Sequence, residues 1–245
     1  MADKILPLLP PLLTPDDFRT ATLAWIQTIE QPTATWYQMF EVGGSPLTAV
    51  SFPMETIMAL LSTVRAYYIE ARFMVINGQF SIGLYATDIN HVRLSAYFPA
   101  YSWWTMPVTG EVAHSFTGVD QTPYALVQAW TTAWAQVPPP NLKTEMFATS
   151  YGTLEGYSFK AADFMQPLYE AQDMTGMDIR VDLGLHGYYP AVTSGNSALQ
   201  YTFGLVLRLS LPQPVAEQAI PMQLMASIGS KSAFFDLSTP CPPGT

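Results

Sequence analysis

The dipeptide Asn77-Gly78, between two runs rich in β-branched and aromatic residues, constrains the fold more than any other feature of this sequence. A type I′ hairpin turn needs positive φ at both central positions, which asparagine and glycine tolerate best. Such a turn pairs Ile76 with Gln79, so the numbers of facing residues sum to 155. One face of the hairpin then holds only apolar residues, with Ile69, Ala71, Phe73 and Val75 opposite Ala86, Leu84, Ile82 and Phe80. Because a slip of one residue would turn that face to water, pattern and turn predict the same antiparallel register.

Alternation of apolar and polar residues recurs along the chain. It predicts half-buried strands in HVRLSAYF (91–98), DIRVDLGLHG (178–187) and ALQYTFGLVLRLSLP (198–212). Further strands are expected in PMQLMASIG (221–229) and KSAFFDLST (231–239), with weaker patterns in TGEVAHSFTG (109–118) and TEMFATSYGTLEGYSF (144–159). Strands with one wet and one dry face pair antiparallel, as in sandwiches and barrels.

Two segments carry the features of helices, 15–30 and 123–137. Thr14 is suited to the N-cap of the first, and Pro15 to its first position. Thr122 and Pro123 repeat this arrangement at the second. The prediction is therefore an all-β fold, or a β-rich fold with two short helices. We expect an antiparallel, jelly-roll-like β-sandwich of about eight to ten strands with helices in its connections.

The domain organisation follows from the ends of the chain. Residues 1–13 form an apolar, proline-rich segment, which we expect to be an extended arm. Its leucines need a surface to dock on, either on this domain or on a neighbour: Leu6, Leu8, Leu9, Leu12 and Leu13. Residues 14–238 are expected to form a single β-sandwich domain, and residues 239–245 a flexible tail.

The low content of charged residues and the negative net charge indicate which kinds of partner the protein can bind. Charged residues make up 12% of the chain, about half of the roughly 25% usual for soluble domains, so neutral polar groups must cover much of the surface. Such a surface suits a protein surrounded by copies of itself, and it equally suits a monomer with a Ser/Thr-rich β surface. The net charge of −9 and the scattered Lys and Arg residues argue against direct nucleic-acid binding.

The sequence predicts folding in the cytoplasm. Prolines interrupt the apolar run after Lys4, and no small-residue cleavage site follows it, so we expect no signal peptide. No run of about 18 apolar residues is present, which predicts no transmembrane segment. With Cys241 as the single cysteine, no internal disulfide can form.

Catalytic and metal-binding patterns are weak. The three histidines, His91, His114 and His186, fall on three candidate strands without the local spacing of a metal site, so we expect surface roles and no metal. Cys241 lies in a tail where an ordered base is hard to supply. Glu70 and Arg72 share one strand face, which predicts a surface ion pair. The sequence therefore predicts a protein that is not an enzyme and needs no cofactor.

The stretch AYFPAYSWW (96–104) concentrates five aromatic rings without a charge. Pro99 cannot donate to a strand ladder, so Tyr101, Trp103 and Trp104 are expected in an exposed loop after the strand. We predict that these rings contact a partner, with another protein subunit favoured over a sugar.

Two functions fit these features. The first is a non-enzymatic structural subunit that self-assembles into a shell, and a viral or phage capsid protein with a jelly-roll fold fits it best. Its partners would be copies of itself and other structural proteins. Since the chain has no basic arm, another protein or an internal membrane layer would separate it from packaged nucleic acid. The alternative is a carbohydrate-binding or receptor-binding β-sandwich module, such as a lectin-like virion appendage.

Overall fold

The predicted hairpin is confirmed residue by residue. Strands β4 (Tyr68–Ile76) and β5 (Gln79–Thr87) pair antiparallel, with Ile76 opposite Gln79 and Tyr68 opposite Thr87. Both turn residues have positive φ, 52° at Asn77 and 77° at Gly78. The turn therefore fixes the same register that the apolar pattern predicted.

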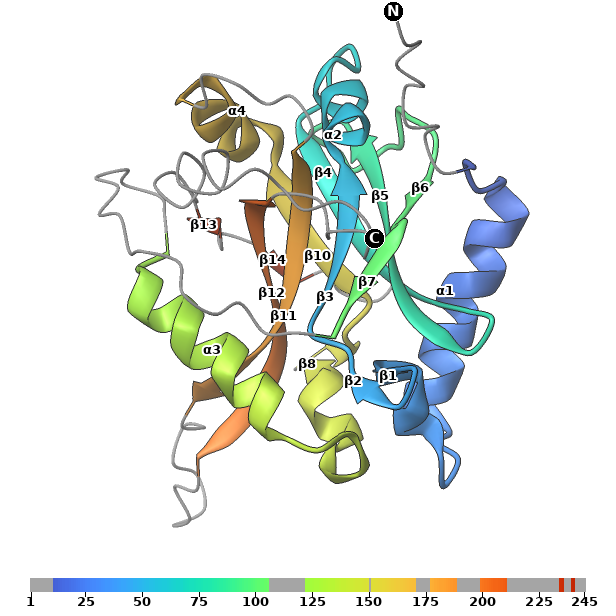
Figure 1. Cartoon of the computed structure of the whole chain (residues 1–245). Helices are drawn as coiled ribbons and strands as arrows, with labels where there is room; N and C mark the ends of the chain where they lie inside the picture. Colours follow the sequence, from blue (N-terminus) through green and yellow to red (C-terminus); the bar gives the residue numbers. More distant parts are fainter. Residues whose placement is uncertain are drawn as a thin grey trace, which may run out of the picture.

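The computed structural model describes residues 11–105, 122–149, 151–170, 177–188, 199–210, 234–235 and 239–240. Two five-stranded antiparallel sheets form the body of this part of the chain (Figure 1). The first sheet has the order β14 (Thr239–Pro240), β10 (Gly156–Lys160), β4, β5 and β6 (Phe98–Pro99). The second sheet has the order β13 (Phe234–Phe235), β12 (Gln200–Ser210), β11 (Asp178–Tyr188), β3 (Ala49–Pro53) and β7 (Ser102–Trp104). Two further two-stranded sheets pair β1 (Glu41–Val42) with β2 (Ser45–Pro46) and β8 (Ala148–Thr149) with β9 (Gly152–Thr153).

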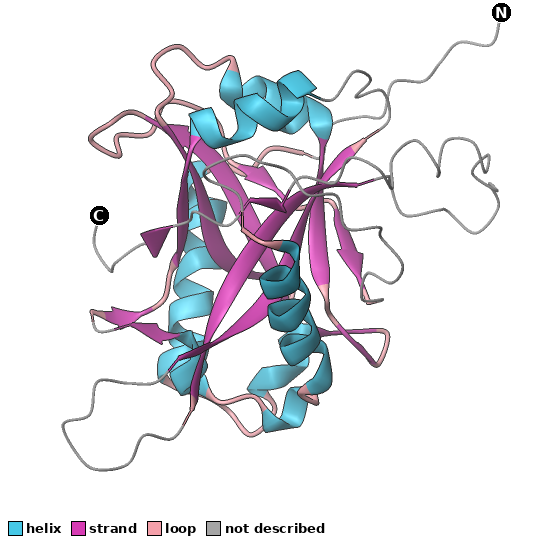
Figure 2. Ribbon diagram, turned by 90° about the vertical axis from the view of Figure 1, so that its left-hand side faces the viewer, coloured by secondary structure: helices cyan, strands magenta, loops and turns pink. Residues whose placement is uncertain are grey.

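Helices contribute more to the fold than the sequence predicted. The described residues contain α1 (Pro15–Glu30), α2 (Met54–Leu61), α3 (Tyr124–Gln136) and α4 (Ala161–Glu170), with 3-10 turns η1 (Trp36–Phe40), η2 (Pro139–Asn141) and η3 (Thr144–Phe147). Helices α1 and α3 lie on opposite sides of the sheets, and α2 and α4 lie together at one end (Figures 1 and 2). The fold is thus mixed α and β with antiparallel sheets, and the expectation of an all-β chain was wrong. None of the described helices is long and apolar enough to cross a membrane.

The helix starts were predicted with unequal success. In α1, the Thr14 hydroxyl accepts a hydrogen bond from the Asp17 backbone N at 3.1 Å, as expected for an N-cap. In α3, Pro123 is the N-cap and no side chain caps the helix, so the predicted role of Thr122 was wrong. The difference arises because proline supplies the extended backbone of the cap position itself.

The two large sheets share one aromatic core. Phe203 on β12 contacts Phe73 of β4 and Phe80 of β5, with ring centroids 5.3 and 5.9 Å apart. The same ring contacts Phe147 of η3 and Trp134 of α3. Because strands, helices and turns all meet at Phe203, the inner faces of the sheets and the connecting helices form a single core.

Segment 91–98 is not the half-buried strand that its alternation predicted. The Asp88 carboxylate accepts backbone hydrogen bonds from Asn90 and Val92, which turns the chain directly after β5. His91 adopts a left-handed φ of 60° in this turn, and Val92 is 59% exposed. Arg93 forms a single bridge with Thr87, and the strand β6 that pairs with β5 contains only Phe98 and Pro99.

Strand β11 is buried on both faces, although its sequence alternates. Its apolar residues face the core, as expected. Its polar residues Asp178, Arg180 and Asp182 are also buried, so the prediction of a half-buried strand was wrong there. Trp130 of α3 covers the same outer face at Gly184, where an added Cβ would lie 3.2 Å from the tryptophan Cβ. Segments 109–118 and 221–229 lie outside the described residues.

Candidate functional site

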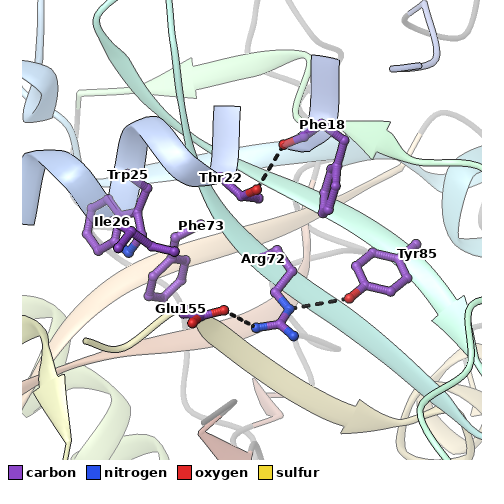
Figure 3. Close-up of a pocket in the computed structure, with 8 residues that line it drawn as sticks. All are labelled: Phe18, Thr22, Trp25, Ile26, Arg72, Phe73, Tyr85 and Glu155. Carbon is purple, nitrogen blue, oxygen red and sulfur yellow. Dashed lines mark hydrogen bonds and ion pairs between the residues drawn. The ribbon is translucent and has the colours of Figure 1, made fainter. Parts of the chain in front are cut away.

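A pocket opens between α1 and strands β4 and β5 of the first sheet (Figure 3). Its volume is about 160 Å³. Helix α1 contributes one wall, β4 and β5 the opposite wall, and the residue before β10 part of the floor. The lining residues are Phe18, Thr22, Trp25, Ile26, Arg72, Phe73, Tyr85 and Glu155.

The polar groups of this pocket are bonded to one another. The Arg72 guanidinium donates to Glu155 Oε2 at 2.9 Å and to the Tyr85 hydroxyl at 3.3 Å. Burial raises the pKa of the Glu155 carboxyl, and the Arg72 charge opposes that rise. Since the cation and the carboxylate compensate each other, the pocket offers aromatic walls over a paired polar floor. That chemistry suits an apolar group better than a free ion.

Glu70 and Arg72 do not lie at the surface, so the prediction of a surface ion pair was wrong about their exposure. Both residues are buried, and each has its own partners. Arg72 bonds Glu155, while Glu70 Oε1 lies 2.7 Å from Nδ1 of His91. Loop residues on either side supply these contacts: Glu155 precedes β10, and His91 follows β5.

Glu70 is the centre of a second polar cluster. Its carboxylate accepts a hydrogen bond from the Ser158 hydroxyl on β10 and contacts the His91 ring. The His91 ring stacks on Tyr68, with centroids 4.6 Å apart and planes inclined by 6°. The buried carboxylate and the stacked tyrosine thus fix the orientation of a half-exposed imidazole.

A third cluster lies on the outer face of the second sheet. Asp182 bonds Nε of Arg180 at 2.7 Å and Nε of Arg208 at 2.5 Å. Arg180 also lies over the ring of Trp104, 4.4 Å from its centre. These side chains are buried, so the cluster acts as a structural ion network between β7, β11 and β12.

The predicted aromatic anchors do not form an exposed loop. Trp103 and Trp104 lie on β7, opposite Val50 and Ala49 of β3. The Trp103 indole donates to the Phe80 carbonyl at 2.9 Å, and the Trp104 indole to the Ser51 hydroxyl at 3.2 Å. Pro99 lies in β6 and does not end the sheet structure, because the chain crosses from the first sheet to the second there. The loop prediction for these tryptophans was therefore wrong.

Tyr101 precedes β7 and keeps part of its ring in solvent. Its hydroxyl donates a hydrogen bond to Asp178. Burial raises the pKa of Asp178 to about 6, and the hydrogen bond from Tyr101 opposes that shift. Burial and the neighbouring carboxylate also raise the pKa of Tyr101.

The ends of the predicted arm and tail contact the first sheet. The Leu13 backbone N donates to the Tyr97 carbonyl at 3.1 Å, and Leu12 is 52% exposed. Leu6, Leu8 and Leu9 lie outside the described residues. Thr239 and Pro240, in the predicted tail 239–245, pair with Ser158 and Tyr157 as β14.

The two histidines that the structure describes lie in separate parts of the fold. His91 bonds Glu70, His186 stacks on Trp130 with centroids 3.8 Å apart, and His114 lies outside the described residues, as does Cys241. Within the described ranges, no three His, Cys, Asp or Glu side chains gather as metal ligands. For the rest of the chain, the absence of a metal site stays a prediction from the sequence.

Sequence reasoning missed the pocket residues Phe18, Tyr85 and Glu155 as a group. They come from a helix, a strand and a loop that only the tertiary fold brings together. The one available indication was the register of the hairpin, which places Tyr85 on the same face as Glu70 and Arg72. Comparison of the chain with protein families, curated proteins and solved structures gives no match.

Proposed function

We propose that this chain is a non-enzymatic structural subunit that self-assembles into a shell, of the kind formed by viral or phage capsid proteins with a jelly-roll fold. The observation that carries self-assembly is a group of large apolar side chains exposed at one end of the first sheet. The jelly-roll assignment rests on the order of strands in the two sheets. The two lines of support are independent of each other.

The loop patch is the exposed apolar group, and it comprises two loops that leave the same end of the β4–β5 hairpin. The loops are joined to the hairpin by hydrogen bonds from Tyr67 N to the Thr87 carbonyl and from Leu94 N to the Ala86 carbonyl. The exposed fractions of its side chains range from 37% to 81%, and its members are Val64, Tyr67, Ile89, Val92 and Leu94. Large exposed apolar side chains on neighbouring loops suit a surface that a second molecule covers.

The strand order supports the jelly roll. An eight-stranded jelly roll consists of two four-stranded sheets conventionally lettered BIDG and CHEF. In this chain, β12-β11-β3-β7 corresponds to BIDG and β14-β10-β4-β5 to CHEF. The chain then begins at the third strand of the roll, and its last strands take the places of the first two. The proposed fold is therefore a circular permutation of the jelly roll, with the β11–β12 pair as the added link.

A second copy of this chain is the occupant we propose for the loop patch. The chain carries few charges, so copies can approach without strong repulsion despite the net charge of −9. The base of the N-terminal arm lies beside the patch, because Leu13 pairs with Tyr97, three residues after Leu94. Partners other than this chain would include structural proteins that separate the shell from nucleic acid.

The carbohydrate-binding alternative loses two aromatic rings of segment 96–104 as candidates, while Tyr101 keeps part of its ring in solvent. It needs aromatic ring faces open to a sugar. The Tyr97 ring stacks on Phe18 at 3.8 Å, and Arg180 covers the Trp104 ring. Their faces are thus already used in packing.

Light scattering after size exclusion, followed by negative-stain microscopy, tests the proposal with the full chain. We expect particles many times heavier than the 27.1 kDa chain, with a regular ring, sheet or shell form. Val92→Glu, which puts a charge in the loop patch, should shift the population toward single chains. Tyr151→Glu is the matched control, because Tyr151 is at least as exposed but lies in the distant β8–β9 turn. A 27.1 kDa species at every concentration and salt condition would contradict self-assembly.

A further inference from the structure

The N-terminal arm enters the described fold next to the pocket of Figure 3. Leu13 pairs with Tyr97, and the Tyr97 ring stacks on Phe18, which lines the pocket. Ten residues precede Pro11, and an extended chain of that length spans roughly 33 Å. The anchor point of the arm at Leu13 therefore lies close to a pocket of this kind.

The pocket fits a branched apolar side chain. Its volume of about 160 Å³ is close to that of protein cavities of roughly 150 Å³ that hold a benzene-sized group. Phe18, Trp25 and Phe73 supply aromatic walls, and Arg72 is bonded to Glu155 and Tyr85. A ligand without hydrogen-bonding groups thus leaves the charges of the floor paired.

We propose that a leucine of residues 1–10 from a neighbouring copy occupies this pocket. The inference rests on the proposed function, since it names the contact by which one subunit holds the next. Residues 1–10 contain Leu6, Leu8 and Leu9 between prolines, and their two charged side chains, Asp3 and Lys4, compensate each other. A proline-rich segment is already extended before it binds, so docking costs it less conformational entropy.

The direction of the arm favours a neighbour over the same chain. Leu13 is held in an extended bridge, and α1 starts two residues later at Pro15. To reach the pocket along its own α1, the arm would have to reverse at Pro10-Pro11, where two consecutive prolines favour extended backbone. A contact with the pocket of a neighbouring copy does not require this reversal.

Photo-cross-linking in the full chain tests this contact. Leu8 is replaced by p-benzoylphenylalanine, and the assembled protein is irradiated and run on a denaturing gel. We expect a covalent dimer, with mass spectrometry locating the cross-link on α1 between residues 18 and 26 or on residues 72–85. A cross-link within one chain, or a dimer joined elsewhere, would overturn the inference.

A pair of substitutions on one helix makes the test specific. Thr22 lines the pocket, and its hydroxyl bonds the Phe18 carbonyl one turn back. Thr28 makes the same bond to Ala24 but does not line the pocket. Thr22→Phe should lower the yield of cross-linked dimer by about tenfold, the order expected when one leucine side chain loses its burial site. Thr28→Phe should leave the yield unchanged.

The outcome also separates this inference from the proposed function. Circular dichroism of both variants verifies that the fold is retained. If Thr22→Phe leaves both particles and dimer yield intact, the arm does not use this pocket, while self-assembly stands. If the unsubstituted chain scatters light as a 27.1 kDa species, self-assembly itself fails and the intersubunit contact fails with it.

Discussion

Arg208 and Asp182 form an ion pair inside the fold, with guanidinium Nε 2.5 Å from Oδ2 and side chains only 2% and 4% exposed. Arg180 lies directly opposite Arg208 in the β11–β12 register and bonds the other oxygen of the same carboxylate. One carboxylate thus compensates two cations in a part of the protein that water does not reach. Removing a single member of such a network costs more than removing all of it, because the remaining charges stay buried.

Asp182→Asn should therefore lower the free energy of unfolding by about 3–5 kcal/mol. Urea denaturation followed by tryptophan fluorescence measures this change. The control is Asp16→Asn, which breaks the exposed pair with Arg19 and should cost less than about 1 kcal/mol. Replacing Arg180, Asp182 and Arg208 together by Met, Leu and Met should recover most of the loss, and a triple variant less stable than Asp182→Asn would contradict the explanation.

Phe203 is the second residue on which stability depends. From the second sheet, its ring contacts aromatic residues of the first sheet, of α3 and of η3. Phe203→Ala should cost about 3–5 kcal/mol in the same denaturation experiment, since it opens a cavity that these rings cannot close. Tyr201→Ala on the same strand, at an exposed position, should cost less than about 1 kcal/mol. Equal losses for both would show that Phe203 does not organise the core.

The sequence was most informative where local chemistry and pattern agreed. Asn77-Gly78 determined a turn, the turn determined a register, and all nine pairs of β4 and β5 follow it. Thr14 and Pro15 likewise fixed the start of α1. In these places every interaction needed for the prediction lies within a few residues along the chain.

Prediction failed where distant parts of the chain decide the environment. The polar residues of β11 alternate as on a wet sheet face, but Arg208 and Trp104 cover them. Arg72 and Glu70 were expected at the surface, but both are buried. Arg72 contacts a loop residue 83 positions away in the chain, and Glu70 contacts one 21 positions away. Local sequence patterns do not indicate which residues far apart in the chain will contact each other, and this chain has no disulfide or metal-ligand motif that would. The pocket and both polar clusters were therefore found only in the three-dimensional structure.

The pH dependence of stability should carry a contribution from Asp178. Burial raises the pKa of this carboxyl from 3.8 to about 6, and nearby Glu55 adds to the rise. The native state therefore binds the proton more tightly than the unfolded state does, and the stability from this group is present below pH 4 and lost as pH rises through 6. The loss amounts to at most about 3 kcal/mol. Asp178→Asn, which keeps an acceptor for Tyr101, should abolish this part of the pH profile in urea denaturation between pH 4 and 7.

His186 should act in the opposite direction over the same range. Burial lowers the pKa of its imidazole from 6.5 to about 4, so the unfolded state binds the proton more tightly. Stability from this group is present above pH 6.5 and is lost as pH falls toward 4. The two residues therefore mask each other in the unsubstituted protein, whose stability should change little between pH 4 and 6.5. His186→Phe keeps a ring to stack on Trp130 and removes the titration, so its stability should fall as pH rises, which exposes the Asp178 contribution. The double variant Asp178→Asn with His186→Phe should show a clearly smaller slope than His186→Phe alone, with a remainder of the same sign from Glu155, whose pKa burial also raises. An undiminished slope would mean that Asp178 is not the group that titrates.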